Sequence, residues 1–293
     1  MRKIRRLYLQ NEKGERRGFN GEGGVYATNL AGFGFSLEPK FSDLGRGFFP
    51  TVSSNAEPQN TLAFTIVMTR NPYTTYYPFV NWLAAAEKLT MVYDPTGTQE
   101  YFRDVSVGFL QKGELTQMGW LELLSSFDCL TPWYRPLPTA LNISNNNTED
   151  IKCYDYAYTS ELRYGSENPA SLQAQIVGTG HIPGALTVIV RGGMTNPQLR
   201  LVGNLTGKTY GVCSLSVVLE ETDALMFSSL YENSYVKKRS ADGTETDLLD
   251  VLDLSREPFF HIPVNEPCTL SIEADGAFAG RAEMQIYYYY RSV

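Results

Sequence analysis

The chain is poor in the residue types that most enzymes use for chemistry. It has two histidines in 293 residues, and its four cysteines form no Cys-x-x-Cys pair. His181 and His261 are far apart, and two histidines are too few for most zinc sites unless cysteines join them. No Gly-x-Ser-x-Gly elbow or other nucleophile signature occurs. We therefore expect no catalytic residue, no metal and no cofactor, although a carboxylate pair for glycoside cleavage would meet only in the fold.

Long apolar runs are missing as well. Nowhere do about eighteen consecutive apolar residues occur, so we expect no membrane span. The stretch Met1–Arg6 is basic like the start of a signal peptide, but Leu7–Asn20 supplies charges and glycine where an apolar run is required. We expect that the protein is not exported by that route.

Basic residues are fewer than acidic ones. With 25 Lys and Arg against 32 Asp and Glu, the formal charge is -7, which disfavours sequence-independent binding to phosphate backbones. The cysteines lie far apart in the sequence, and we expect them to be reduced and mostly buried. They are Cys129, Cys153, Cys213 and Cys268.

Two segments come close to ligand-binding motifs. Gly203–Thr209 falls one residue short of the phosphate-binding Gly-x-x-x-x-Gly-Lys-Thr, and a strand pattern follows it where a helix N-terminus is needed. Asp242–Asp247 does not match the spacing of a calcium loop. Both segments are predicted to be hairpin turns.

What the chain has in quantity is apolar and aromatic side chains. Hydrophobic residues make up 43% of it, with 15 Phe and 19 Tyr, which is typical of a folded, strand-rich protein. After Pro78, apolar residues recur at offsets of three and four and predict a helix with one buried stripe. The stripe consists of Phe79, Trp82, Leu83, Ala86 and Leu89.

Strands are predicted on the C-terminal side of this helix. In Glu100–Leu110 the apolar residues Val105, Val107 and Phe109 alternate, as in a half-buried strand, and Trp120–Leu130 is again strand-like. Prolines between 132 and 138 then stop any helix or central strand. We therefore predict a boundary near 138, which gives domains 1–138 and 139–293.

The second half reads as short strands separated by turns. Ala185–Arg191 is a β-branched run bounded by glycine and proline, and Thr269–Ala274 and Glu283–Tyr290 flank a further turn. This spacing predicts a β-sandwich. The segment Leu141–Asp150 is interpreted as a linker or exposed loop, and Asp247–Leu254 as one helical turn or an edge strand.

Several of these motifs, in this order, resemble the distal tail proteins at the tail tip of long-tailed phages of Gram-positive bacteria. The first half contributes Gly32–Phe35, Tyr77–Phe79 with Trp82, Leu89–Pro95, Gln111–Glu114 and Thr131–Tyr134. The second half contributes Gly192–Pro197, Asp242–Thr244, Pro258–Pro263 and the tyrosine-rich end of the chain. The resemblance implies a mainly β protein: an N-terminal β-sandwich or split barrel with one α-helix, and a C-terminal galectin-like β-sandwich. The cluster with a stacking Trp that sugar binding by a galectin would require is not visible, so only the fold is carried over.

The resemblance also implies a structural role. It predicts a homo-oligomeric, six-fold ring around a channel for DNA, in the tail tip or baseplate of a virion assembled in the bacterial cytoplasm. Its partners would be the tail tube protein, the tape measure protein, and a tail-associated lysin, tail fibre or other baseplate protein, with no sequence-specific nucleic-acid binding and no membrane. As interface residues we select Phe48 and Phe49 in Pro39–Asn60, and Lys112 and Glu114 in the loop Lys112–Met118. The alternatives are a carbohydrate-binding module for receptor recognition and a glycan-cleaving tail enzyme.

Overall fold

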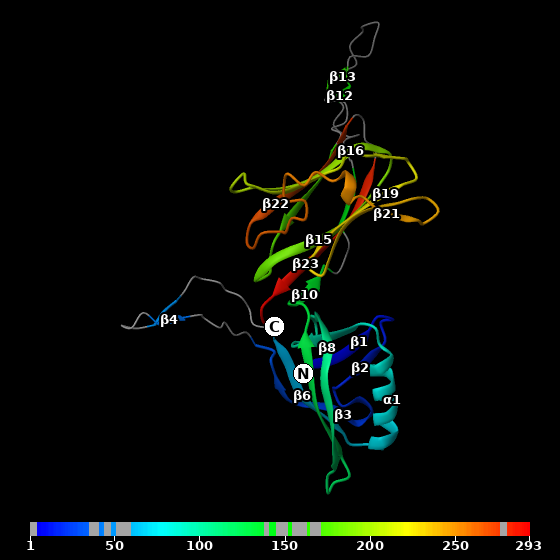
Figure 1. Cartoon of the computed structure of the whole chain (residues 1–293), viewed down its shortest axis with the longest axis vertical. Helices are drawn as coiled ribbons and strands as arrows, with labels where there is room; N and C mark the ends of the chain where they lie inside the picture. The colour runs from blue at the N-terminus through cyan, green and yellow to red at the C-terminus, as the bar shows by residue number, and fades with distance from the viewer. Residues whose placement is uncertain are drawn as a thin grey trace. The chain divides into compact units, whose positions relative to one another are not determined.

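The protein is mainly β, with antiparallel sheets, as the sequence predicts. A computed structural model describes residues 5–34, 41–43, 48–50, 60–137, 141–144, 152–153, 163–164, 171–275 and 280–293, with side chains in 5–34, 60–137, 171–275 and 280–293. The chain divides into two compact units, unit 1 (Met1–Arg135 with Tyr290–Val293) and unit 2 (Pro136–Tyr289). Figure 1 shows the elements of each. Within the described ranges, no helix is long and apolar enough to cross a membrane.

In its described residues, unit 1 is built on one antiparallel set of strands with one α-helix, α1 (Pro72–Ala85). Its strands are β1 (Arg6–Asn11), β2 (Arg16–Gly18), β3 (Val25–Ala31), β4 (Phe41–Asp43), β5 (Phe48–Pro50), β6 (Thr61–Met68), β7 (Leu89–Asp94), β8 (Tyr101–Leu115), β9 (Leu121–Cys129) and β10 (Trp133–Pro136), with a short 3-10 turn η1 (Glu22–Gly24). Pairing runs in the order β2-β1-β7-β8-β9-β6-β3, while β4 and β5 pair with each other.

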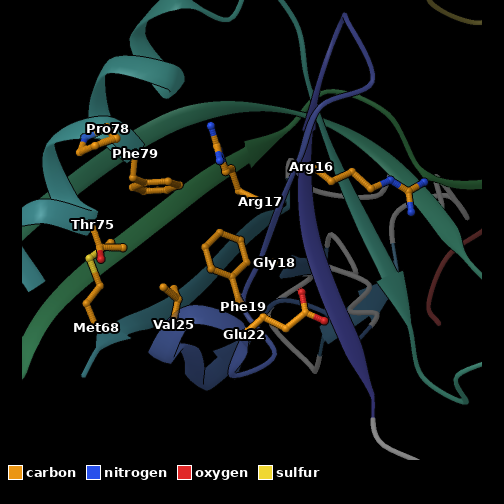
Figure 2. A pocket seen from close by; sticks show the side chains of 10 residues that line it. All are labelled: Arg16, Arg17, Gly18, Phe19, Glu22, Val25, Met68, Thr75, Pro78 and Phe79. Atoms are coloured by element: carbon orange, nitrogen blue, oxygen red, sulfur yellow. The ribbon is translucent and has the colours of Figure 1, made fainter. Parts of the chain in front are cut away.

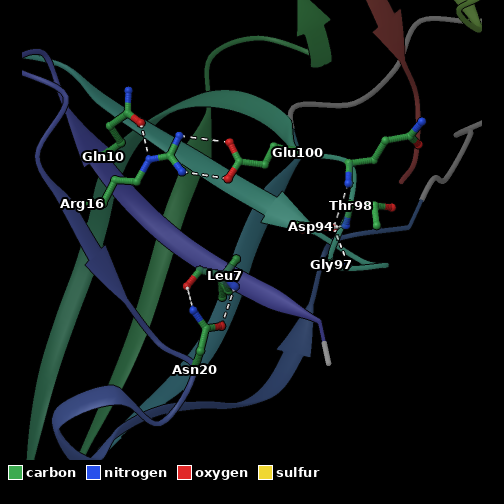
Figure 3. Close-up of polar contacts among 9 residues, drawn as sticks. Leu7, Gln10, Arg16, Asn20, Asp94, Gly97, Thr98 and Glu100 are labelled. Carbon is green, nitrogen blue, oxygen red and sulfur yellow. Dashed lines mark hydrogen bonds and ion pairs between the residues drawn. The ribbon is translucent and has the colours of Figure 1, made fainter. Parts of the chain in front are cut away.

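The ends of this order are brought together by Phe19 and Asn20, which makes unit 1 a split barrel. The backbone N–H of Phe19 donates to Leu7 O of β1 at 2.9 Å, and Ala27 N of β3 donates to Phe19 O at 3.0 Å. The side chain of Asn20 also forms hydrogen bonds with both backbone polar groups of Leu7. Its Oδ1 accepts from Leu7 N at 2.7 Å and its Nδ2 donates to Leu7 O at 3.1 Å (Figure 3).

Two further polar links in Figure 3 hold the loop between β7 and β8 in place. Arg16 donates to both carboxylate oxygens of Glu100, at 2.8 and 3.0 Å. Asp94 Oδ1 accepts the backbone N–H groups of residues 96–99, with Gly97 nearest at 2.6 Å. Such a bidentate pair and such an Asx-type turn fix the loop geometry more than they stabilise the fold.

The helix differs from the prediction at both ends. It begins at Pro72, so Pro78 lies inside it, and Leu89 is the first residue of β7. Pro72 occupies the first turn, where its missing N–H has no partner to lose. Pro78 costs one interior hydrogen bond, which the burial of the neighbouring Phe79 and Trp82 offsets. The buried stripe itself is confirmed, because these two side chains are 6% and 9% exposed.

Strand β8 keeps the predicted alternation only up to Val107. A β-bulge lies between Val107 and Phe109, so the extra residue shifts the side chains after it by one position. Phe109 therefore points away from the core and is 52% exposed, whereas Leu110 packs against the core. The interpretation of Phe109 as a buried position was wrong for this reason.

Unit 2 is a β-sandwich of two main sheets. Its elements are β11 (Leu141–Ser144), β12 (Lys152–Cys153), β13 (Arg163–Tyr164), β14 (Ser171–Val177), β15 (Ile182–Arg191), β16 (Met194–Gly203), β17 (Thr209–Ser214), β18 (Val218–Leu219), β19 (Ala224–Leu230), β20 (Asn233–Arg239), β21 (Glu245–Asp247), the 3-10 turn η2 (Leu249–Val251), β22 (Pro267–Asp275) and β23 (Arg281–Tyr290). One sheet has the order β11-β23-β15-β19-β20-β21, and the other has β14-β22-β16-β17 with β18 on β16. Alternate residues of both, such as Val188 and Ile272, are fully buried and form the shared core.

Several predictions for unit 2 can now be judged. The turn prediction is confirmed for Gly203–Thr209, which joins β16 to β17. In the acidic segment it is confirmed for Asp242–Thr244, which lies between β20 and β21, whereas Glu245–Asp247 forms β21 itself. Leu141–Ser144 is not a loop, since it pairs with β23. Cys129, Cys213 and Cys268 are free and buried, and burial raises the pKa of Cys213 to about 12. Within the described residues, no group of three His, Cys, Asp or Glu side chains is placed to hold a metal ion.

Glu266, just before β22, anchors the turn between β16 and β17. Its carboxylate accepts hydrogen bonds from Tyr210 Oη and from Thr206 Oγ1, the latter at 2.7 Å. These donors, Tyr210 first, lower the pKa of Glu266 below its usual value. The ionised form is thus favoured in the folded protein.

We expect Trp82→Ala to destabilise unit 1 by roughly 3 to 5 kcal/mol, because truncating a buried aromatic side chain leaves a cavity. The indole also donates from Nε1 to Glu15 Oε2 at 3.0 Å, a bond that the variant loses. Urea unfolding of the full chain measures the change, with Tyr77→Ala, at a helix position that is 60% exposed, as the control. Equal stability of the two variants would contradict the assignment of Trp82 to the core.

We expect Glu266→Gln to lower the stability of unit 2 at pH 7 and to match the wild type more closely in acid. A carboxyl group whose folded pKa is depressed stabilises the fold above its unfolded pKa of about 4.3, and this contribution disappears as the pH falls through the folded value. Unfolding curves between pH 7 and pH 3 test this. Glu273→Gln, at an exposed position of β22, should show no such convergence.

Candidate assembly surfaces of unit 1

The β8–β9 hairpin forms an arm that continues past the rest of unit 1. Strand β7 pairs with β8 only as far as Val105, whereas β9 pairs with β8 as far as Leu115. Figure 1 shows the hairpin extending beyond α1 and β3. A hydrogen bond of 2.8 Å from Thr116 N to Trp120 O closes the tip, where Met118 is 73% exposed. The arm therefore presents apolar side chains at its far end.

The four-stranded sheet β3-β6-β9-β8 of unit 1 lacks a partner strand along part of each of its two end strands in the described part of the chain. From Ser106 onward, β8 pairs with β9 on one side only. At the other end of the same four strands, β3 pairs with β6. Its second edge is joined to residues 19–21 by the Asn20–Tyr26 bridge and by backbone hydrogen bonds from Ala27 N to Phe19 O and from Gly21 N to Val25 O, and no described strand pairs with it from Thr28 onward. The four-stranded sheet β3-β6-β9-β8 thus has an open edge at each end, which can accept another strand.

The core packs on one face of this sheet. We call the opposite side the open face, because in the described part of the chain most of its side chains are partly or fully exposed, although Thr65, Val67 and Ser126 are buried. Its positions are Tyr26, Thr28 and Ala31 of β3, Thr61, Ala63, Thr65 and Val67 of β6, Glu122, Leu124, Ser126 and Asp128 of β9, and Ser106, Phe109 and Gln111 of β8. These include two carboxylates and no Lys or Arg. Leu124 and Phe109, each 52% exposed, lie on adjacent strands of it.

The selected interface residues fall in different places. Lys112 belongs to β8 rather than to a loop, and its Nζ lies 4.8 Å from the ring centre of Tyr73 and 5.7 Å from that of Tyr76 on α1. Lys112 therefore packs the arm against helix α1 of the same chain. Glu114 is exposed near the end of β8 and forms no ion pair within the described residues.

Phe48 and Phe49 lie in β5, paired with Asp43 and Ser42 of β4. Their side chains, and most of Pro39–Asn60, lie outside the described residues, so their selection stays a prediction.

Sequence reasoning missed the open face. Its one visible signal is Leu124, an apolar residue out of phase with Leu121, Leu123 and Phe127, which are all fully buried. The edges gave no signal, because an unpaired edge depends on which strands meet and not on composition.

Unit 1 also contains a cavity of about 290 Å³ between α1 and the start of β3 (Figure 2). Its lining is Arg16, Arg17, Gly18, Phe19, Glu22, Val25, Met68, Thr75, Pro78 and Phe79. Phe19, Met68 and Phe79 form a buried apolar floor. In Figure 2 the side chain of Arg16 points away from the cavity. The guanidinium carbon of Arg17 lies 5.4 Å from the ring centre of Trp82 on α1. The lining has no histidine or cysteine and thus suits an apolar group better than a reaction.

Comparison with known proteins gives one family and several structures. Residues 6–130 match the family described as distal tail protein, N-terminal domain. A chain of the phage P2 baseplate in its activated conformation with Ca aligns at 15% identity and a TM-score of 0.64, covering 99% of this chain and 100% of that chain. The same baseplate with Sr gives the same values. The Dit protein of phage SPP1, described as a hub of the adsorption apparatus in phages that infect Gram-positive bacteria, aligns at 10% identity and 0.60, covering 96% and 98%. No curated protein matches the sequence.

At these identities the structural likenesses concern the fold, which they share over nearly the whole chain. The family match supplies the identity of unit 1, and it covers the helix, the arm and both open edges.

Proposed function

Residues 6–130 are the N-terminal domain of a distal tail protein, and from this premise, which places the chain among phage tail and baseplate hub proteins, we propose that copies of it form a closed ring. The ring, six-fold as the resemblance implies, would join the tail tube to the host-recognition apparatus and leave a channel for DNA. Its neighbours would be the tail tube protein, the tape measure protein, and a tail-associated lysin, tail fibre or other baseplate protein.

The observation that carries this proposal is the pair of open edges on one sheet. The β8 edge and the β3 edge are different surfaces, so pairing one with the other between copies is heterologous. Heterologous contacts produce a ring when the rotation between copies closes. Added main-chain hydrogen bonds would satisfy the exposed N–H and C=O groups of both edges.

Closing the sheet in this way also selects its inner face. One face of the four strands is occupied by the core, with Phe64 and Leu123 fully or almost fully buried, and by the helix and the remaining strands. The outside of a ring has the larger circumference and accommodates this bulk. The open face would therefore line the channel.

The charge of the open face suits a DNA conduit. Glu122 and Asp128 are the only Asp, Glu, Lys or Arg among its described residues, and most others are hydroxyl or small side chains. Cations on the wall would retain DNA through the phosphate contacts that give binding proteins their affinity. An acidic or neutral wall repels phosphate only over about 8 Å in physiological salt, so it permits passage without holding the chain.

We expect the purified full chain to form rings with an open centre, seen by negative-stain imaging and by native mass spectrometry. A bis-maleimide cross-linker identifies the contact. A variant with Thr28→Cys on β3 and Gln111→Cys on β8 should give a ladder of covalent oligomers that ends at the ring size, because each copy joins one neighbour through each edge.

Each single cysteine variant is the matched control and should give no ladder. Dimers from the Gln111→Cys variant alone would mean that like edges meet, and rings that persist without any ladder would place the contact elsewhere. All variants carry Cys153→Ser, because the side chain of Cys153 lies outside the described residues, whereas Cys129, Cys213 and Cys268 are buried. The Cys153→Ser protein without an added cysteine sets the background.

We expect the wild-type ring to show no salt-sensitive affinity for duplex DNA. Leu124→Lys places one cation per copy on the open face and should create binding that weakens between about 50 and 200 mM salt. Tyr77→Lys adds the same charge on α1, outside the channel, and should have the smaller effect, because a ring of charges facing a lumen reinforces its field. Tight, salt-sensitive binding by the wild type would indicate a basic lumen instead.

A further inference from the structure

Unit 2 contains two arginines directly opposite each other. In the pairing of β15 with β23, Arg191 is the cross-strand partner of Arg281 (the two strands lie side by side in Figure 1). Like charges in this position are destabilising, because their side chains leave the sheet on the same face at short range. A sheet that keeps such a pair has a repulsion that a bound anion would relieve.

The two charges are poorly compensated within the described residues. The side chain of Arg281 forms no ion pair and no hydrogen bond with described residues. The nearest carboxylate oxygen to Arg191 belongs to Glu283, whose Oε1 lies 3.8 Å from Nε, beyond hydrogen-bonding distance. That Nε is buried without a hydrogen-bond partner, and the terminal nitrogens of the same guanidinium make no hydrogen bond with described residues. Both guanidinium groups thus retain free donors.

A cavity of about 340 Å³ lies over this pair. Arg191, Gly192, Glu221, Thr222, Asp223 and Arg281 line it. Its size is near the lower end of small-molecule sites, which span about 300 to 1,000 Å³. The space therefore fits a small ion together with an organic substituent.

Of the two acidic residues in the lining, one is already neutralised. Asp223 is 5% exposed, and its Oδ2 accepts from Lys238 Nζ at 2.7 Å and from Glu220 N at 2.9 Å. The hydrogen bond from Lys238 holds the pKa of Asp223 below its usual value. Glu221, in contrast, is exposed at the rim and forms no ion pair in the described part of the chain.

We propose that this cavity binds a singly charged phosphodiester. Its two non-bridging oxygens would accept hydrogen bonds from the guanidinium groups of Arg191 and Arg281, and the Thr222 hydroxyl supplies a further donor. Guanidinium groups match phosphate oxygens in geometry and charge. The carboxylate of Glu221 at the rim disfavours a second negative charge, so a diester is preferred over a phosphate dianion.

The phosphodiester is a small molecule or a repeating unit of a polyol-phosphate polymer, and not a nucleic acid. The chain carries a formal charge of -7, and the site offers two arginines, one of them with only a long ion pair to Glu283, rather than the extended basic surface that a nucleic acid backbone requires.

Calorimetric titration of the full chain tests the proposal with four ligands: bis-glycerol phosphate, a short glycerol phosphate oligomer, inorganic phosphate at pH 8 and a single-stranded oligonucleotide. We expect the two glycerol compounds to bind more tightly than inorganic phosphate. If the oligomer has a higher affinity per phosphate group than bis-glycerol phosphate, the natural ligand is the polymer. The oligonucleotide binding best would overturn the choice of ligand.

Variants distinguish binding at this site from a general effect of the charge of the protein. Arg281→Gln should weaken binding at least tenfold without lowering the melting temperature, because it removes a repulsion. Arg256→Gln, at an exposed loop position of the same unit, is the matched control and should bind as the wild type does. Glu221→Gln should narrow the preference for the diester over inorganic phosphate. No binding by the wild type, or equal binding by Arg281→Gln and Arg256→Gln, would overturn the proposal.

Discussion

The fold of unit 1 depends on the change of partner that strand β8 makes at Val105. This residue, 2% exposed, is paired with Leu89 of β7 on one side and with Cys129 of β9 on the other. Before it, β8 belongs to the layer that contains β1 and β2. Beyond it, β8 belongs to the four-stranded sheet and has only one neighbour. The single strand thus ties the two layers of the split barrel together and at the same time provides an open edge.

The other features of unit 1 follow from this arrangement. Because β8 continues past β7, the hairpin with β9 becomes an arm, and Lys112 on its inner side packs against the tyrosines of α1. Because Phe19 joins β1 to β3, the far edge of the sheet is partly closed near Tyr26 and open beyond it. The bulge at Gly108 turns Phe109 onto the open face. Core, arm, edges and face are therefore parts of one strand arrangement.

The two units differ in the charged side chains that they present at their candidate functional surfaces. In unit 1, the open face carries Glu122 and Asp128 without a cation, which suits the passage of a polyanion. In unit 2, Arg191 and Arg281 face each other across two strands beneath a cavity. The two proposals, a channel wall that does not retain DNA and a site that binds a phosphodiester, are thus compatible within one chain, because binding depends on the local arrangement of charges and not on the formal total of -7.

The sequence by itself determined the mainly β class, the buried stripe of α1 and the hairpin turns of unit 2, because periodicity and turn chemistry are local properties. It misplaced the start of the helix, since Pro72 and Pro78 are both acceptable in a first turn and only the packing against the sheet shows that the helix extends through the second. It also missed the bulge beside Phe109, the open face and the arginine pair. Each of these depends on which strands pair and in what register, and a shift of one residue reverses the face on which every later side chain lies. Only the tertiary structure decides that register.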